Sequence, residues 1–244
     1  MSSEVWLAGV DGCRHGWVAA FVRPSGDEIV VRVVPTFADV LNAREQPAIV
    51  TVDMPIGLPE RIGPTGRGPE AAVRPLLGMR QSSVFSVPSR PAIYAHDYGA
   101  ACRIAAETSD PPRKVSKQLF MIAPKIREVD GVLRADQGAA ARVREVHPEV
   151  AFWRLNGERA LEEPKKVKSR PYEPGLALRR RLLVAAGVPR VVADAAPPVG
   201  AAADDLIDAL ACAVIARRVH AGRAQPFPQH YGRDAFGLPI AIWA

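Results

Sequence analysis

The sequence contains few cysteines, few aromatic residues and no long apolar run. Cysteine occurs 3 times among 244 residues, and aromatic residues make up 6%. Because Cys13, Cys102 and Cys212 are widely spaced and odd in number, they fit reduced thiols and not a paired-cysteine zinc site. No stretch approaches the ~18 apolar residues of a membrane span, and residues 1–4 lack the basic end of a secretory signal. These absences predict a cytoplasmic protein that does not enter a membrane.

The sequence does contain enough apolar material for one sizeable folded domain. The hydrophobic fraction is 48%, and the length of 244 residues fits a single domain over residues 1–244, with room for an insertion. The formal net charge of +6 favours an anionic partner such as nucleic acid, although many basic proteins bind none.

Three short apolar runs open the chain. Residues 5–11, 17–22 and 29–34 are separated by turns that contain glycine or proline, which predicts three antiparallel strands. Residues 36–44 then show helical spacing of apolar side chains, and the apolar run 48–53 indicates a strand buried on both faces. A strand that follows a crossover helix usually pairs in parallel through a right-handed connection, so we expect this fourth strand beside the first.

The middle and the end of the chain are less regular. Residues 71–127 mix helical spacing with proline and glycine, which indicates a helical insertion after a loop over 54–70. Pro124 is expected to kink or restart the helix that begins at Ser116. We expect the remaining elements in this order: an edge strand over 129–134, a fifth strand over 142–147, a helix from Pro148, a basic loop over 156–175, a helix over 176–186, a long helix over 201–219 and a tail on the surface.

Four aspartates are positioned to converge. Asp11 ends the first strand and Asp53 the fourth, so parallel pairing of these strands would place both at one edge of the sheet. Asp205 and Asp208 lie three apart and share a face of the last long helix. Each has an ordinary alternative when taken alone, because aspartate suits turns and helix starts. Together they predict a metal centre, since carboxylate oxygens are hard ligands for Mg²⁺ or Mn²⁺.

Such a centre could hold two divalent ions, which activate a water and stabilise the leaving oxygen of a phosphodiester. Glu145, on the fifth strand, is a candidate further catalytic acid, with a solvent-facing strand residue as the alternative. Glu149 is a weaker candidate, and His147 either transfers protons or is structural. The basic residues that could bind substrate phosphates, each of which also fits a solvated surface side chain, are Arg14, Lys117, Lys125, Lys165 and Lys166.

The order of strands and acids resembles the ribonuclease H-like fold, which implies an α/β protein with a mixed five-stranded sheet flanked by helices. The segment Asp205-Leu206-Ile207-Asp208-Ala209-Leu210-Ala211 resembles the acidic helix of the RuvC-type Holliday junction resolvases. More specifically, the chain resembles the family called domain of unknown function 429, a family of predicted ribonuclease H-like nucleases. The stretches that carry this resemblance are Gly9 to Trp17, Val52 to Pro59, Arg80 to Phe85, Ser116 to Gln118, Pro124 to Asp130, Glu145 to Glu149 and the acidic helix.

The resemblance implies a nuclease that hydrolyses phosphodiester bonds of DNA or RNA with two Mg²⁺ or Mn²⁺ ions. Three other functions use a similar core. An actin-like or sugar-kinase-type phosphotransferase needs a second glycine-rich phosphate loop, and the sequence has no such motif. A catalytically inactive nucleic-acid-binding module could keep the acids to hold metal, and a phosphatase acting on a small substrate would need a short, closed groove.

Overall fold

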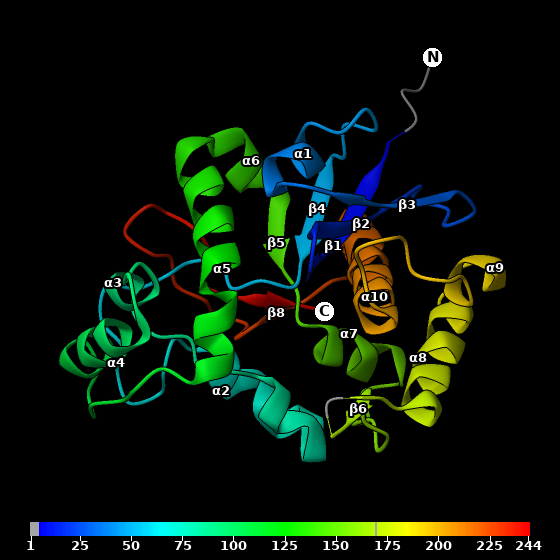
Figure 1. Ribbon diagram of the computed structural model, residues 1–244. Helices are drawn as coiled ribbons and strands as arrows, with labels where there is room; N and C mark the ends of the chain where they lie inside the picture. Colours follow the sequence, from blue (N-terminus) through cyan, green and yellow to red (C-terminus); the bar gives the residue numbers. More distant parts are fainter. Residues whose placement is uncertain (1–4, 169) are drawn as a thin grey trace.

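A seven-stranded mixed sheet forms the centre of the protein, for which a computed structural model describes residues 5–168 and 170–244 (Figure 1). The strand order is β3-β2-β1-β4-β5-β9-β8. β2 pairs antiparallel with both β1 and β3, whereas β4 pairs parallel with β1 and β5 parallel with β4. The strands of this sheet are β1 (Leu7–Cys13), β2 (Gly16–Val22), β3 (Ile29–Val34), β4 (Ile49–Val52), β5 (Val143–Glu145), β8 (Pro226–Phe227) and β9 (Ile242–Trp243).

The first five strands have the predicted ribonuclease H-like topology. Three antiparallel strands are followed by two parallel ones, and the fourth strand lies beside the first, as expected. A separate antiparallel pair, β6 (Lys166–Val167) and β7 (Arg170–Pro171), lies in the segment predicted to be a basic loop. Two sets of residues that entered the sequence predictions, 1–4 and Ser169, lie outside the described residues.

Helices cover both faces of the sheet, and Figure 1 shows α10 and α5 on opposite sides of the central strands. Side chains of α7, α8 and α10 form the core on one face, and those of α1, α3, α4 and α5 form the core on the other. In the part of the chain that the structure describes, no helix is both long and apolar enough to cross a bilayer. The helices are α1 (Phe37–Leu41), α2 (Pro69–Val73), the 3₁₀ helix η1 (Arg74–Ser83), α3 (Arg90–Ile93), α4 (Tyr98–Glu107), α5 (Lys117–Ala135), α6 (Gln137–Arg142), α7 (Pro148–Leu155), α8 (Glu173–Ala185), α9 (Arg190–Ala193) and α10 (Ala203–His220).

Two local predictions were wrong, and of the two effects expected at Pro124 the restart of the helix does not occur. The edge strand expected over 129–134 is the end of α5, where Ile126, Val129 and Leu133 are buried at helical spacing. Pro124 lies within α5, and the helix continues past it. The tail does more than cover the surface, because it supplies β8 and β9, and Ile242 of β9 pairs in parallel with β5.

α10 packs against the sheet at backbone distance. A Cβ atom added to Gly9 of β1 would lie 1.9 Å from Ala213 N and 2.3 Å from Ala209 O, so only glycine fits at this strand position. The Thr51 hydroxyl of β4 donates to Cys212 O at 2.7 Å, which holds the helix over the next strand. Residues 206–216 are buried throughout, which is typical of a helix enclosed on every side.

We expect Gly9→Ala to destabilise the protein by ~3 kcal/mol or more, because its methyl group would overlap the α10 backbone. The matched control is Gly131→Ala in α5, an exposed position where an added Cβ meets no atom within 4 Å. This control should be neutral or stabilise the helix by up to ~1 kcal/mol. Urea unfolding of both variants measures the difference, and equal stabilities would contradict the close packing of α10.

Candidate metal centre

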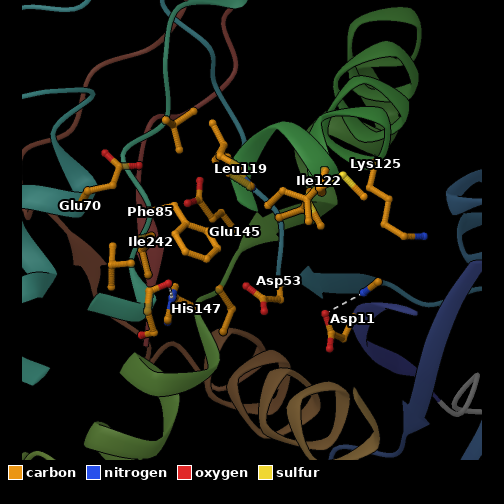
Figure 2. Close-up of a pocket in the computed structure, with 18 residues that line it drawn as sticks. Asp11, Asp53, Glu70, Phe85, Leu119, Ile122, Lys125, Glu145, His147 and Ile242 are labelled. Atoms are coloured by element: carbon orange, nitrogen blue, oxygen red, sulfur yellow. Dashed lines mark hydrogen bonds between the residues drawn. The ribbon is translucent and has the colours of Figure 1, made fainter. Parts of the chain in front are cut away.

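Three carboxylates from three separate elements meet at one end of the central strands β1 and β4. Asp11 belongs to β1, Asp53 directly follows β4, and Asp208 lies in α10. One oxygen from each of them lies within 4.8 Å of one from each of the others. Figure 2 shows Asp11 and Asp53 side by side at one end of a cavity. The structure thus brings together three of the four aspartates that the sequence placed in a metal centre.

Strand alternation explains why these side chains face α10. In β1, Val10 belongs to the core under α5, so its neighbour Asp11 points to the opposite face, which α10 covers. In β4, Val52 belongs to the same core, and Asp53 follows it on the α10 face. Val10 and Val52 are partners in the parallel register, and Asp53 N donates to Val10 O at 2.9 Å. The two aspartates therefore lie next to each other on adjacent strands, with their side chains on the same face of the sheet.

Burial and mutual repulsion make these acids hard to ionise. Burial raises the pKa of Asp11 well above its usual value, and Asp53 and Asp208 raise it further. Burial also raises the pKa of Asp53 to about 7, with Lys165 opposing the shift. The pKa of Asp208 is raised to about 7 by burial, again against the effect of Lys165. Added positive charge would favour the ionised carboxylates at neutral pH.

A buried ion-pair network surrounds Asp208. The Lys165 ammonium pairs with Asp208, and its Nζ lies 3.9 Å from Glu149 Oε1. Arg179 donates to both carboxylate oxygens of Glu149, each at 2.8 Å. Burial alone would lower the pKa of Lys165, but Asp208 and Glu149 raise it above its usual value. Lys165 is therefore a charged lysine held among acids.

The burial and hydrogen bonding of the Asp208 carboxylate favour a bound cation. Its side chain is only 5% exposed, and Oδ1 has no hydrogen-bond partner within residues 5–168 and 170–244. A buried carboxylate oxygen without a partner is costly, and a cation would compensate it. The clustered side chains offer only carboxylate oxygens, which suit hard ions such as Mg²⁺ and Mn²⁺. The residues present therefore fit a hard divalent ion.

Asp205 makes a different contact from the one predicted. Its carboxylate accepts a hydrogen bond from Ala202 N at 2.8 Å, at the beginning of α10. This contact satisfies a free backbone donor of the first turn, which is the ordinary role of an acid at that position. Asp205 lies outside the group of three carboxylates.

Glu145 points away from the three clustered aspartates. It pairs in register with Val52, so its side chain lies on the face opposite to α10. Arg67 donates to its two carboxylate oxygens at 2.6 and 2.9 Å, and Ile56 N donates at 2.8 Å. The carboxylate therefore fixes the loop after β4, and it borders the cavity without joining the metal cluster.

Three of the predicted phosphate-binding residues lie near the cavity or at the surface. Arg14 is exposed in the turn after β1, and Lys117 is exposed at the start of α5. Lys125 lines the cavity, and its Nζ donates to Gly16 O at 2.5 Å. Of these three residues, Arg14 and Lys117 have side chains open to a ligand from solvent.

Lys165 and Lys166 both contact acids of α10. Lys165 pairs with Asp208, and Lys166 Nζ lies 2.6 Å from Asp204 Oδ2. Lys166 is 46% exposed, whereas Lys165 is 21% exposed. Consecutive lysines thus bind acids one helical turn apart, one inside the cluster and one at its rim.

A cavity of about 270 Å³ opens beside Asp11 and Asp53. Its walls come from the loop after β4, the segment after η1, α5 and the segment around β5. Figure 2 shows the Phe85 ring near the middle of the cavity, with Leu119 and Ile122 of α5 on one side and Ile242 on the other. The walls are mainly apolar, and the acids among the lining residues are Asp11, Asp53, Glu70 and Glu145.

No curated protein and no solved structure matches this chain. A family model does match, over residues 9–233, and its description is a protein of unknown function, DUF429. The chain belongs to the DUF429 family. The family predicted from the sequence motifs is therefore confirmed, and the DUF429 match includes the three clustered aspartates and Lys165.

Two features of this DUF429 protein escaped the sequence predictions. One is Arg179, which lies fully buried in α8 and binds Glu149. Its position between Leu176 and Leu183, on the apolar face of the helix, was a usable signal, because a buried arginine needs an acidic partner. The other is Phe85, whose motif was noted but whose place in the cavity depends on how η1 packs against α7 and α2.

We expect Asp53→Asn to stabilise the metal-free protein increasingly as pH rises from about 4 to about 7. The pKa of Asp53 is raised from 3.8 to about 7 by burial, so the folded state keeps a proton that the unfolded chain loses, and stability falls with rising pH. Asparagine removes this dependence, and the gain near neutral pH should be on the order of 1 kcal/mol or more.

Urea unfolding at several pH values, in buffer with a chelator, measures this effect. The exposed Asp110→Asn variant is the control, and its stability should follow that of the wild type at every pH. If the free energies of unfolding of Asp53→Asn and the wild type changed with pH in the same way, a raised pKa of Asp53 in the folded state would be contradicted.

Proposed function

We propose that this DUF429 protein is a nuclease that hydrolyses phosphodiester bonds with Mg²⁺ or Mn²⁺ held by Asp11, Asp53 and Asp208. The observation that supports this most is the meeting of three carboxylates on β1, β4 and α10 of a ribonuclease H-like sheet. The Oδ1 atom of Asp208, buried beside the other two, adds a coordination position that no side chain of residues 5–168 or 170–244 fills.

A divalent ion held by Asp11, Asp53 and Asp208 would supply an activated water and neutralise charge on the phosphodiester. The protein contributes a preorganised set of oxygens, since the register of β1 and β4 fixes two carboxylates and the packing of α10 fixes the third. Asp11 and Asp208 are buried and Asp53 is half-buried, which strengthens the interaction of these oxygens with a cation.

The charge distribution supports an anionic polymer as substrate. The net charge is +6, although the centre itself is rich in acids. Arg14 and Lys117 are exposed on the turn and the helix next to the cavity, where they could bind phosphates on either side of the cleaved bond. Lys125 is held against β2 and contributes positive charge to the cavity wall.

The cavity favours an unpaired nucleotide over an intact duplex. Its volume of about 270 Å³ suits one small group and not a double helix. An aromatic ring facing aliphatic side chains is the kind of surface on which unpaired bases stack. The same enclosed shape favours, as a second candidate function, a phosphatase that acts on a mononucleotide at the same centre.

We expect Asp208→Asn to lower metal-dependent cleavage of single-stranded DNA or RNA by on the order of 100-fold or more, the size typical of losing one preorganised electrostatic contact. Asp205→Asn, three residues away on α10, should retain most of the activity, because asparagine also caps helices. The measurement is cleavage of labelled oligonucleotides, duplexes and a mononucleotide with Mn²⁺.

Full activity of Asp208→Asn, or no cleavage of any polymer by the wild type, would refute the nuclease. Release of phosphate from the mononucleotide alone would favour the phosphatase.

We expect Phe85→Ala to weaken binding of a single-stranded oligonucleotide by roughly 10-fold, since the loss of one stacked base costs about 1–3 kcal/mol. Met79→Ala is the control, because Met79 is a 78% exposed apolar residue of η1, and it lies outside the cavity. Fluorescence anisotropy in Ca²⁺ measures both affinities. Equal affinities for the wild type and Phe85→Ala would show that no base enters this cavity.

A further inference from the structure

Lys165 is half-buried, with its side chain 21% exposed, and its ammonium points into the carboxylate cluster. Its Nζ pairs with Asp208 and lies 3.9 Å from Glu149 Oε1. The side chains of these two acids are only 5% and 4% exposed. A lysine on a loop normally extends its ammonium into water, so the acids determine this position.

The backbone around Lys165 is anchored at two points. Arg179 donates to Glu163 O at 2.9 Å. Pro164 O lies so close to the start of α8 that a Cβ added to Gly175 would be 1.9 Å from it. These contacts hold the backbone immediately before Lys165 in place, which orients its side chain toward the cluster.

The two oxygens of Asp208 are used differently. Oδ2 pairs with Lys165, whereas Oδ1 is buried and has no hydrogen-bond partner among the described residues. Asp11 and Asp53 lie on the sheet side of the same group. One carboxylate can therefore serve an ammonium through one oxygen and a metal ion through the other.

The formal charges of the centre leave room for one divalent ion. The acids are Asp11, Asp53, Asp208 and Glu149, and the bases are Lys165 and Arg179. A bound cation favours the ionised form of all four acids. Four negative charges against two positive charges then leave two negative charges, which one divalent ion neutralises. A second ion would give this buried site excess positive charge, with the ammonium already beside Asp208.

We propose that the centre takes one divalent ion, held by Asp11, Asp53 and Oδ1 of Asp208, and that the ammonium of Lys165 on Oδ2 replaces the second ion. This inference rests on the proposed metal-dependent function and departs from the two ions expected from the sequence. Lys165 is a positioning residue here: it orients Asp208 and provides a fixed positive charge next to the reacting phosphate.

The test is the number of Mn²⁺ ions bound, measured by isothermal titration calorimetry and by the electron paramagnetic resonance signal of free Mn²⁺. The wild type should bind one ion. Lys165→Met removes the ammonium from the cluster and should bind two, whereas Lys165→Arg keeps the charge and should bind one. Lys166→Met is the matched control, since Lys166 pairs with Asp204 at the rim, and it should bind one ion with unchanged affinity.

The outcomes separate this inference from the proposed function. Two ions on the wild type would overturn the role of Lys165 while leaving a metal-dependent nuclease in place. One ion on both the wild type and Lys165→Met would also overturn it, because the ammonium would then not occupy the place of a cation. If none of the four proteins binds Mn²⁺, the metal centre itself is refuted. Should Lys165→Met fail to fold, Lys165→Gln, which also removes the charge but keeps a hydrogen-bond donor for Asp208, takes its place and should bind two ions.

Discussion

The packing of α10 against β1 is the contact on which the rest of the structure depends. Gly9 lets the helix approach the strand at backbone distance, with Ala209 and Ala213 opposite it. This approach brings Asp208 to Asp11, although the two residues come from opposite ends of the chain. A larger side chain at this strand position would separate the helix from the sheet, and the cluster would lose one of its three carboxylates.

The cluster carries an electrostatic cost that its surroundings reduce. Burial is the largest cause of the raised pKa values of these three carboxylates, and neighbouring negative charges raise them further. Lys165 and Arg179 offset part of this repulsion, through Asp208 and Glu149 respectively. The remaining negative charge and the unpartnered Asp208 oxygen are the features that fit a cation.

The segment between β4 and β5 gives the centre its cavity. The structure places Phe85 and the apolar side chains of α5 next to Asp53, so a motif far from the acids in sequence becomes a wall of the same site. Glu145 and Arg67 hold this segment through hydrogen bonds to the loop after β4. The site of this DUF429 protein therefore joins a sheet edge, a buried helix and a helical segment that covers them.

The sequence by itself determined the first five strands, the parallel pairing of β4 with β1, and the convergence of Asp11 with Asp53, because these depend on local apolar patterns and on the handedness of one crossover. It misplaced the strand over 129–134, since a short segment with a few apolar residues does not reveal that α5 runs through it. Only the tertiary structure decided which acids share the site. Asp205 and Asp208 are alike in sequence, but the rotation of α10 buries one and leaves the other to cap the helix. Glu145 and Asp53 end neighbouring strands, but strand alternation places their side chains on opposite faces of the sheet.

The ion-pair partners of Lys165 and Arg179 likewise depended on the tertiary structure. The sequence shows that a side chain is charged, but long-range packing decides which opposite charge lies beside it.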